Sequence, residues 1–152
     1  MSYNLVVRDI THTDIALFYD GMVDLLTSHL DWHDFDPKKF RSWLKWAIDD
    51  ADTDTLLCLD GHLPAGYYIA RTVTPIWSSE RISSDVVLYV LPPYRGKGVS
   101  VALLQQWIYN LKGRGVSKAL SGYSLRASED HAQKAYARMG FFKLGEIYAK
   151  RL

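Results

Sequence analysis

Residues 85–104 read DVVLYVLPPYRGKGVSVALL. The first seven, from Asp85 to Leu91, are rich in β-branched and aromatic residues and contain no Gly or Pro, which predicts a β-strand that ends at the two prolines. Apolar residues recur at helical spacing after Gly98, so we predict a helix over residues 98–114. The sequence therefore places a glycine-rich turn between a strand and the first turn of a helix.

A turn of this kind can bind phosphate. The first N–H groups of a helix lack intrahelical partners, and the positive end of the helix dipole lies beside them. Gly96 and Gly98 let a ligand approach the backbone closely, and Arg95 and Lys97 add positive charge. Two nucleotide motifs do not fit, because Val101 replaces the third glycine of a dinucleotide fingerprint and no Ser or Thr follows Lys97 as in a P-loop. We therefore expect another pyrophosphate-bearing ligand.

The segment from Val90 to Ser100 resembles motif A of the GNAT superfamily of N-acyltransferases, in which the pattern is Arg/Gln-x-x-Gly-x-Gly/Ala. Arg95 and Gly98 match it, and Ser100 stands where Gly or Ala is usual, a small substitution that the turn should tolerate. Residues 132–141, AQKAYARMGF, are similar to motif B of the same family, Ala-x-x-x-Tyr-x-x-x-Gly-Phe. Two motifs in this order are far more specific than either alone, and the resemblance is strong over residues 82–142.

The resemblance implies a fold and a cosubstrate. We expect an α/β (α+β) GNAT-like fold in a single domain over residues 1–152, with helices on both faces of a mixed sheet of about six to seven strands. In that fold the central strand and the next one splay apart to admit the pantetheine arm of acetyl-CoA, which main-chain groups near Leu88 and Val90 would contact. The pyrophosphate would be held by the turn residues Arg95, Gly96, Lys97, Gly98, Val99 and Ser100.

The resemblance also implies a catalytic group. Tyr136 occupies the motif B position at which GNAT enzymes commonly place the general acid for the leaving thiolate, and the alternative is a tyrosine of the core. Val86 and Val87 stand where many members carry a glutamate base on the central strand. Asp85 and Tyr89 remain candidates to relay a proton through water, with a solvated strand-end aspartate as the alternative for Asp85. Strand alternation puts Asp85 on the face of Val87 and Tyr89 unless a bulge intervenes.

The acceptor site in this family is usually shaped by the first two helices and the loop between them. In this chain the loop, residues 29–36, reads HLDWHDFD, and Asp31 and Asp34 with the neighbouring aromatics predict a site for a cationic amine. The alternative is that Trp32 and Phe35 pack on the core while the aspartates are solvated. His29 and His33 have the i, i+4 spacing of some zinc sites, but no third ligand has a convincing spacing, so we predict no metal.

Length and composition indicate one ordinary globular domain. The chain has 152 residues, 48% hydrophobic and 23% charged, and its formal net charge of +1 gives no electrostatic reason to expect nucleic acid or an acidic membrane as a partner. Because Cys58 is the single cysteine, an internal disulfide is excluded. Its position in an apolar run argues against an acyl-cysteine mechanism. Because no signal-peptide pattern or run of membrane-spanning length is present, we expect a cytoplasmic protein.

The first half of the chain is predicted as strand, helix, helix and hairpin. A strand over residues 3–8 precedes a helix capped by Thr11, Thr13 or Asp14, and a second helix starts at Asp36-Pro37. The acidic residues 49–54 are predicted as a loop. A hairpin with strands over residues 55–59 and 63–71 turns at Asp60-Gly61, and residues 72–80 link it to the central strand.

The second half continues after the long helix. We expect a strand over residues 117–121 and then a helix capped by Ser128 and ended by Gly140. Residues 141–150 are predicted as a last strand or pair of short strands, and the sequence leaves open whether they pair across a homodimer.

The sequence as a whole predicts an N-acetyltransferase that moves an acetyl group from acetyl-CoA directly to a primary amine in a ternary complex. The acceptor, a small molecule or a protein amine, is not identified by the residues. The alternative is a non-catalytic module on the same fold that binds CoA or a protein partner. Both would bind CoA, but only the enzyme would release free thiol in the presence of an amine.

Overall fold

The computed structural model describes residues 3–29, 36–122, 129–145 and 150. In this part of the chain five strands form one sheet in the order β1-β2-β3-β4-β5. Neighbouring strands from β1 to β4 are antiparallel, and β5 is parallel to β4. The strands are β1 Leu5–Asp9, β2 Thr53–Asp60, β3 Leu63–Val73, β4 Ile82–Val90 and β5 Lys118–Leu120.

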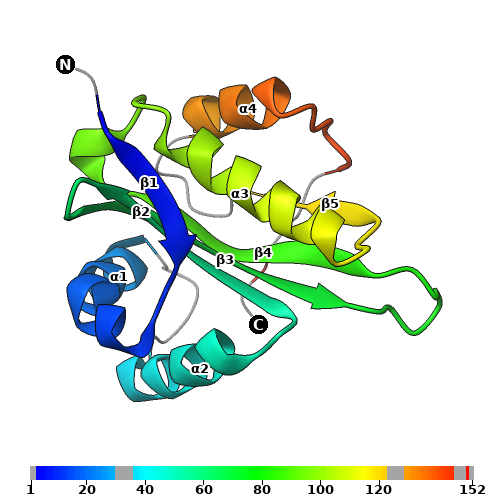
Figure 1. Ribbon diagram of the computed structural model, residues 1–152, viewed down its shortest axis with the longest axis horizontal. Helices are drawn as coiled ribbons and strands as arrows, with labels where there is room; N and C mark the ends of the chain where they lie inside the picture. The colour runs from blue at the N-terminus through cyan, green and yellow to red at the C-terminus, as the bar shows by residue number, and fades with distance from the viewer. Residues whose placement is uncertain (1–2, 30–35, 123–128, 146–149, 151–152) are drawn as a thin grey trace.

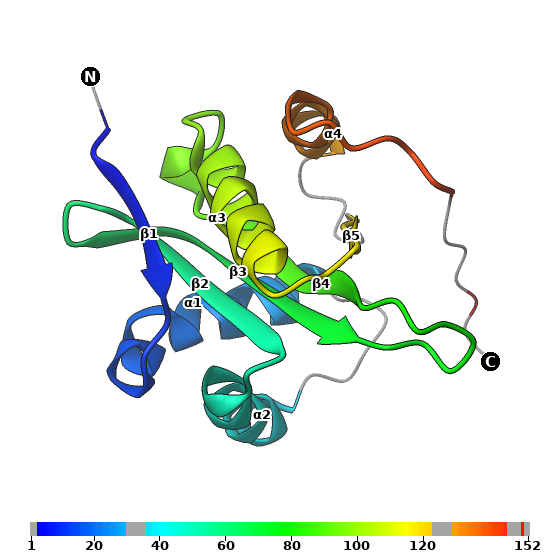
Figure 2. The ribbon, with the colours of Figure 1, turned by 45° about the vertical axis from the view of Figure 1, so that its right-hand side comes forward.

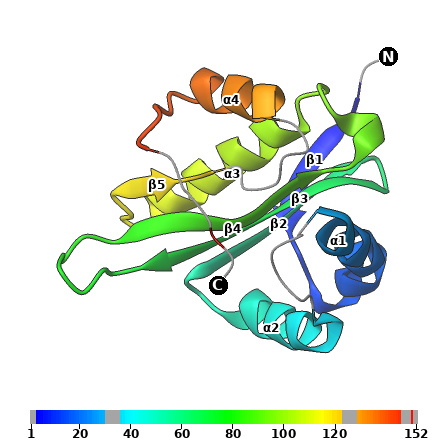
Figure 3. The same ribbon diagram turned by 180° about the vertical axis from the view of Figure 1, so that it is seen from behind.

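Helices cover both faces of the sheet, with α1 and α2 on one face and α3 and α4 on the other (Figures 1 and 3). Their bounds are α1 Ile15–His29, α2 Pro37–Asp49, α3 Val99–Gly113 and α4 Glu129–Arg138, with short 3-10 turns η1 His12–Asp14 and η2 Pro92–Tyr94. This arrangement confirms the predicted mixed sheet with helices on both faces.

Two hydrophobic cores lie on the two faces because successive residues of a strand point in opposite directions. Leu56 of β2 and Tyr68 of β3 belong to the core under α3 and α4, where Trp107 is fully buried. Leu57 and Tyr67, one position away in each strand, belong to the core under α1 and α2. The central strands are therefore buried on both faces, which explains their continuous apolar runs.

Several predicted boundaries are confirmed by capping contacts. The Asp36 side chain accepts hydrogen bonds from the N–H groups of Lys38 and Lys39 at 3.0 Å each, at the start of α2. Thr11 and Asp14 form a capping box before α1, and Asp14 also pairs with Arg8 of β1 at 2.6 Å.

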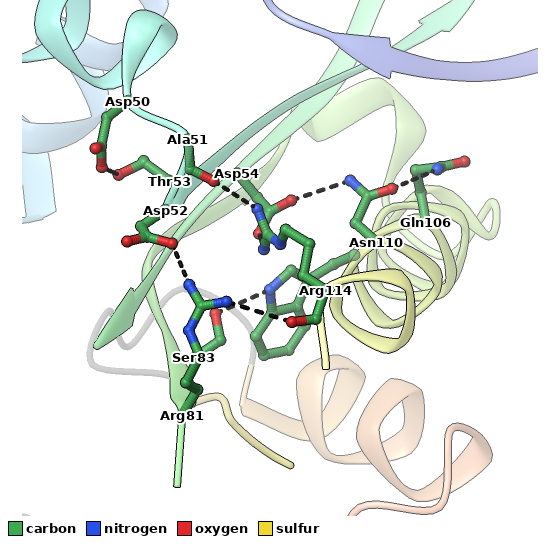
Figure 4. A network of polar contacts seen from close by, with 11 residues as sticks. Asp50, Ala51, Asp52, Thr53, Asp54, Arg81, Ser83, Gln106, Asn110 and Arg114 are labelled. Carbon is green, nitrogen blue, oxygen red and sulfur yellow. Dashed lines mark hydrogen bonds and ion pairs between the residues drawn. The ribbon is translucent and has the colours of Figure 1, made fainter. Parts of the chain in front are cut away.

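The prediction of a loop over residues 49–54 is wrong at both ends, because α2 continues to Asp49 and β2 already begins at Thr53. Asp54 is only 5% exposed. Its carboxylate forms an ion pair with Arg114 and accepts a hydrogen bond from Asn110 Nδ2 at 3.0 Å (Figure 4). Both partners lie near the end of α3, so a contact between distant segments compensates for burying this charge.

Further polar contacts tie the end of α3 to the start of β4 (Figure 4). Arg81 forms an ion pair with Asp52, and its Nη1 donates to the Arg114 carbonyl at 3.3 Å. The Trp107 indole N–H donates to Ser83 Oγ at 3.3 Å inside the core. β4 starts at Ile82, three residues before the predicted start. The polar Ser83 can be a buried strand residue because its hydroxyl oxygen accepts the hydrogen bond from Trp107.

The predicted last strand is not formed by residues 141–145. Phe142 and Leu144 are 83% and 76% exposed, so their side chains gain little from burial there. Residues 146–149 and the predicted cap Ser128 lie outside the described residues. Within those residues the sheet thus has five strands rather than the expected six to seven.

Candidate active site

The glycine-rich turn lies between β4 and α3, where the sequence predicts it. Gly96 and Gly98 have φ angles of 73° and 87°, in the left-handed region where a side chain is strained. Among the described residues, no atom beyond the adjoining residues lies within 4 Å of the place a Cβ would take at either glycine. The turn therefore needs glycine for its conformation and leaves its backbone open to a ligand.

The start of α3 supplies backbone donors. The first intrahelical hydrogen bond runs from the Ala102 N–H to the Gly98 carbonyl at 3.0 Å, so the N–H groups of Val99, Ser100 and Val101 come before it. Gly98 is the N-cap residue and has no side chain with which to cap them. These donors, at the positive end of the helix dipole, suit an anion.

Two cationic side chains belong to the same turn. Arg95 Nε donates to the Val90 carbonyl at 3.3 Å, and its guanidinium lies 6.0 Å from the centre of the Tyr89 ring. Lys97 Nζ lies 5.5 Å from the centre of the Tyr3 ring. Open glycine backbone, first-turn N–H groups and two cations together fit a pyrophosphate.

A β-bulge interrupts β4 at Val86. Ile69 of β3 pairs with Val87 and the next residue, Ala70, pairs with Asp85, so Val86 has no partner in β3. The bulge moves Asp85 to the face of Ala70, which belongs to the core under α3 and α4. Simple alternation would have kept Asp85 on the face of Val87, so the bulge that the sequence analysis left open does occur.

The strand pair β4 and β5 ends immediately before this bulge. β5 pairs with β4 only over Ile82–Ser84. The Leu91 N–H donates to Ala65 of β3 at 3.0 Å, and hydrogen-bonding directions alternate along a strand, so the main-chain groups of Leu88 and Val90 face away from β3. No strand of the described residues covers this edge (Figure 2). Leu88 and Val90 thus direct main-chain groups toward the edge of β4 that β5 does not cover, where the Val90 carbonyl already accepts from Arg95.

Tyr136 of α4 lies at the end of β5. Its hydroxyl donates to the Gly122 carbonyl at 2.8 Å and lies 2.8 Å from Ser121 Oγ. The Tyr68 hydroxyl lies 3.3 Å from the same Ser121 oxygen. Tyr136 is 8% exposed and packs in the core under α3 and α4, so it is both a core residue and part of a polar cluster.

Asp85 contacts the same short segment. Its Oδ1 accepts a hydrogen bond from the Gly122 N–H at 3.0 Å. Burial raises the pKa of Asp85 to about 6, although hydrogen bonds from the N–H groups of Gly122 and of Asp85 itself partly oppose the shift. Gly122 therefore donates its N–H to Asp85 and accepts at its carbonyl from Tyr136, and Asp85 is half-buried and lies within β4.

Tyr89 lies on the opposite face from these groups. It pairs across the strands with Tyr67, with ring centres 5.3 Å apart, and packs in the core under α1 and α2. The structure thus brings Asp85 and Tyr136 together and separates them from Tyr89 by the thickness of the sheet.

Ser121, Gly122 and Tyr68 were not singled out by the sequence analysis. Their contacts join β3, α4 and the segment after β5, which are far apart in the sequence. No spacing or composition signal identifies them, because the polar cluster exists only once the sheet and α4 are assembled.

Other sequence predictions fall partly outside the described residues. Asp31, Trp32, His33, Asp34 and Phe35 lie there, so the amine-binding loop stays a prediction. No group of three or more His, Cys, Asp or Glu residues that could hold a metal occurs in the described ranges. Cys58 is fully buried, and burial raises the pKa of its thiol to about 11, which disfavours the thiolate. None of the helices described has the length and apolar character needed to cross a membrane.

Comparison with known proteins identifies a family. Residues 19–141 match the model of the acetyltransferase (GNAT) family, which covers most of the chain, including the turn and Tyr136. No curated protein gives a significant match.

Solved structures share the fold over nearly the whole chain. A ribosomal-protein-alanine N-acetyltransferase from Brucella melitensis biovar Abortus 2308 superposes with a TM-score of 0.74 at 18% identity, covering 97% of this chain and 99% of that one. The aminoglycoside 6'-N-acetyltransferase AAC(6')-Ih from Acinetobacter baumannii gives 0.74 at 17% identity, covering 98% of each chain. AAC(6')-Iy in complex with a CoA-containing bisubstrate analogue gives 0.76 at 16% identity, covering 98% of this chain and 99% of that one.

Proposed function

Because this chain belongs to the acetyltransferase (GNAT) family, we propose that it transfers the acetyl group of acetyl-CoA to a primary amine by direct attack in a ternary complex. One observation carries the proposal: an open, glycine-based turn follows the end of β4, and a tyrosine hydroxyl lies beside the bulge of the same strand, where its edge is uncovered. The cosubstrate supplies the activated thioester. The buried Cys58, whose thiol pKa is raised, argues against a route through an acyl-cysteine.

The turn and the strand edge would bind the cosubstrate. Residues 95–100 would hold the pyrophosphate through the first-turn N–H groups, with Arg95 and Lys97 balancing its charge. The main-chain groups of Leu88 and Val90 would bind the amides of the pantetheine arm as a neighbouring strand would. From Val90 back to Asp85 the strand extends about 17 Å, which brings the arm to the bulge.

Tyr136 would act as the general acid. Expulsion of the thiolate is easier when a positioned donor protonates its sulfur. The Tyr136 hydroxyl proton is directed at the Gly122 carbonyl by a 2.8 Å hydrogen bond, and Ser121 lies within hydrogen-bond distance of the same oxygen. These contacts fix the hydroxyl at the end of β5, where the uncovered edge of β4 begins.

The general base has two candidates on opposite faces. Asp85 shares the face of Tyr136 and has a pKa raised to about 6, which suits proton acceptance near neutral pH, directly or through water. Tyr89 lies on the face of α1 and α2, from which an acceptor bound by those helices would approach. Bulk water is the remaining alternative.

The acceptor class that we propose is a primary amine. Two of the similar structures are aminoglycoside N-acetyltransferases and one is a ribosomal-protein-alanine N-acetyltransferase, so both small-molecule and protein amines are represented. In this chain Asp31 and Asp34 would attract a cationic amine. Replacing both by Asn should raise the KM for such an amine; an unchanged KM would remove these residues from the acceptor site.

A non-catalytic CoA-binding module is the second candidate. Its support is that Val86 and Val87 replace the glutamate expected on the central strand, with Val86 in the bulge itself. Such a module would keep the turn and the strand edge but lack proton transfer.

Calorimetric titration with acetyl-CoA, followed by thiol-release assays over a panel of amines, tests the proposal. Binding with turnover on any amine supports the enzyme. Binding without turnover on a panel that includes aminoglycosides, polyamines and peptide amines favours the module. Absence of binding contradicts both candidates, because both depend on the turn.

A further inference from the structure

Gly66 of β3 lies where β4 and the start of α3 meet. It pairs with Val90 of β4, directly before the turn. A Cβ at this position would lie 2.7 Å from the Tyr89 carbonyl oxygen and 2.8 Å from Val99 Cγ1. Both distances are well inside ordinary van der Waals contact. The missing side chain therefore allows β4 and the first residue of α3 to approach β3 closely.

Space, rather than backbone conformation, requires glycine here. Gly66 is not among the glycines with positive φ, whereas Gly96 and Gly98 are. The space around the glycines differs as well. Among the described residues, no atom lies near a Cβ at Gly96 or Gly98, whereas packed atoms of β4 and α3 lie against a Cβ at Gly66. Val99, which is 1% exposed, fills the volume that a side chain at position 66 would take.

We propose that Gly66 is a positioning residue for coenzyme A, an inference that rests on the proposed function. Because Gly66 lacks a side chain, Val99 packs directly against β3. This contact sets the position of the first-turn N–H groups of α3 relative to the end of β4. A side chain at position 66 would clash with both Val99 and the Tyr89 carbonyl, so it has to displace the first residue of α3 and the main chain of β4. Each displacement changes a part of the site that the cosubstrate uses.

The test is the affinity for CoA of the wild type, Gly66→Ala and Gly113→Ala, measured by calorimetry. Gly113 ends the same helix, and outside that helix and its chain neighbours no atom of the described residues lies within 4 Å of a Cβ built there. We expect Gly66→Ala to raise the Kd for CoA at least about tenfold and Gly113→Ala to leave it within about twofold. The fragment 3′-phosphoadenosine 5′-diphosphate should lose affinity by the same factor, because it depends on the turn.

A second substitution reports on the mechanism. Adding Val99→Ala to Gly66→Ala removes one of the two clashing atoms and should restore part of the affinity. Circular dichroism and thermal unfolding test whether each variant is folded.

The outcomes separate the two proposals. A wild type that does not bind CoA overturns both. A wild type that binds CoA, with a folded Gly66→Ala variant of equal affinity, overturns only the role of Gly66. If Gly66→Ala does not fold, Val99→Ile enlarges the same contact from the other side, and an unchanged Kd for that folded variant overturns the role of Gly66.

Discussion

The end of β4 and the bulge within it carry the two halves of the candidate site, and they are built in different ways. At the end near Val90, the site is made of backbone: two glycines with positive φ and the first N–H groups of α3. At the bulge near Asp85, it is made of side chains from different elements that meet at Gly122. We call the turn of residues 95–100 the binding half and the cluster of Asp85, Gly122 and Tyr136 the chemical half. The comparison teaches that the conformation of the binding half is encoded locally, whereas the chemical half depends on the assembled fold.

The largest effect should come from the chemical half. Tyr136→Phe removes the proposed proton donor without changing the core volume, so kcat should fall about 100-fold while the Kd for acetyl-CoA stays unchanged. Steady-state thiol release and calorimetry measure the two quantities. Tyr109→Phe is the matched control, since Tyr109 is 74% exposed on α3. A kcat close to that of the wild type would leave Tyr136 as a core residue only.

A second prediction concerns the base. Asp85→Asn keeps an oxygen for the Gly122 N–H but cannot accept a proton, so we expect kcat/KM at pH 7.5 to fall about 30-fold. In the wild type, kcat/KM should rise with pH through about 6 as Asp85 loses its proton, and the variant should lack this rise.

Measuring kcat/KM for Tyr89→Phe in the same way decides on which face of the sheet the general base lies. If Asp85→Asn retains activity and Tyr89→Phe loses it, the proton is accepted on the side of α1 and α2. If both variants kept the activity of the wild type, bulk water would be favoured as the proton acceptor.

A third prediction tests the binding half. Gly98→Ala forces a side chain into the left-handed region at a cost of about 1–2 kcal/mol, so the turn should relax and the Kd for CoA should rise about tenfold. The kcat at saturation should change little, because Tyr136 and Asp85 lie at the bulge of β4, away from the turn. Gly21→Ala serves as the control, since Gly21 has no positive φ and, apart from its own helix, no atom in the described part of the chain lies within 4 Å of a Cβ placed there. A fall in kcat with unchanged Kd would contradict the division of β4 into two halves.

The smallest effect concerns stability against pH and compares Asp85 with Asp14. Burial raises the pKa of Asp85, so its contribution to the free energy of unfolding is present at acid pH and is lost as the pH rises through about 6. Hydrogen bonds from Arg8, and in addition from Thr11, hold the pKa of Asp14 well below its usual range. Its contribution is therefore present above the pKa of the unfolded chain, near about 4, and is lost on acidification.

Urea unfolding of Asp85→Asn between about pH 4 and 7, and of Asp14→Asn between about pH 2 and 5, checks these signs. From low to high pH, Asp85→Asn should gain stability relative to the wild type, and Asp14→Asn should lose it. If the difference in unfolding free energy between variant and wild type changed with pH in the same direction for both variants, burial of Asp85 would not be what distinguishes the chemical half.

The sequence by itself determined the elements whose signals are local. The Asp36-Pro37 start of α2, the Asp60-Gly61 turn and the glycines of the turn before α3 were predicted because capping side chains and positive φ act within a few residues. The mixed sheet with helices on both faces followed from the order of these elements and from the resemblance to the family.

Only the tertiary structure decided how β4 bends and what meets beside it. The bulge at Val86 places Asp85 on the face of Tyr136, and register between strands, which sets a bulge, depends on partners distant in the sequence. The burial of Asp54 depends in the same way on Arg114, sixty positions later. Gly66 looks like any strand glycine until Val99 is packed against it, because steric space is a property of the assembled fold rather than of the residue.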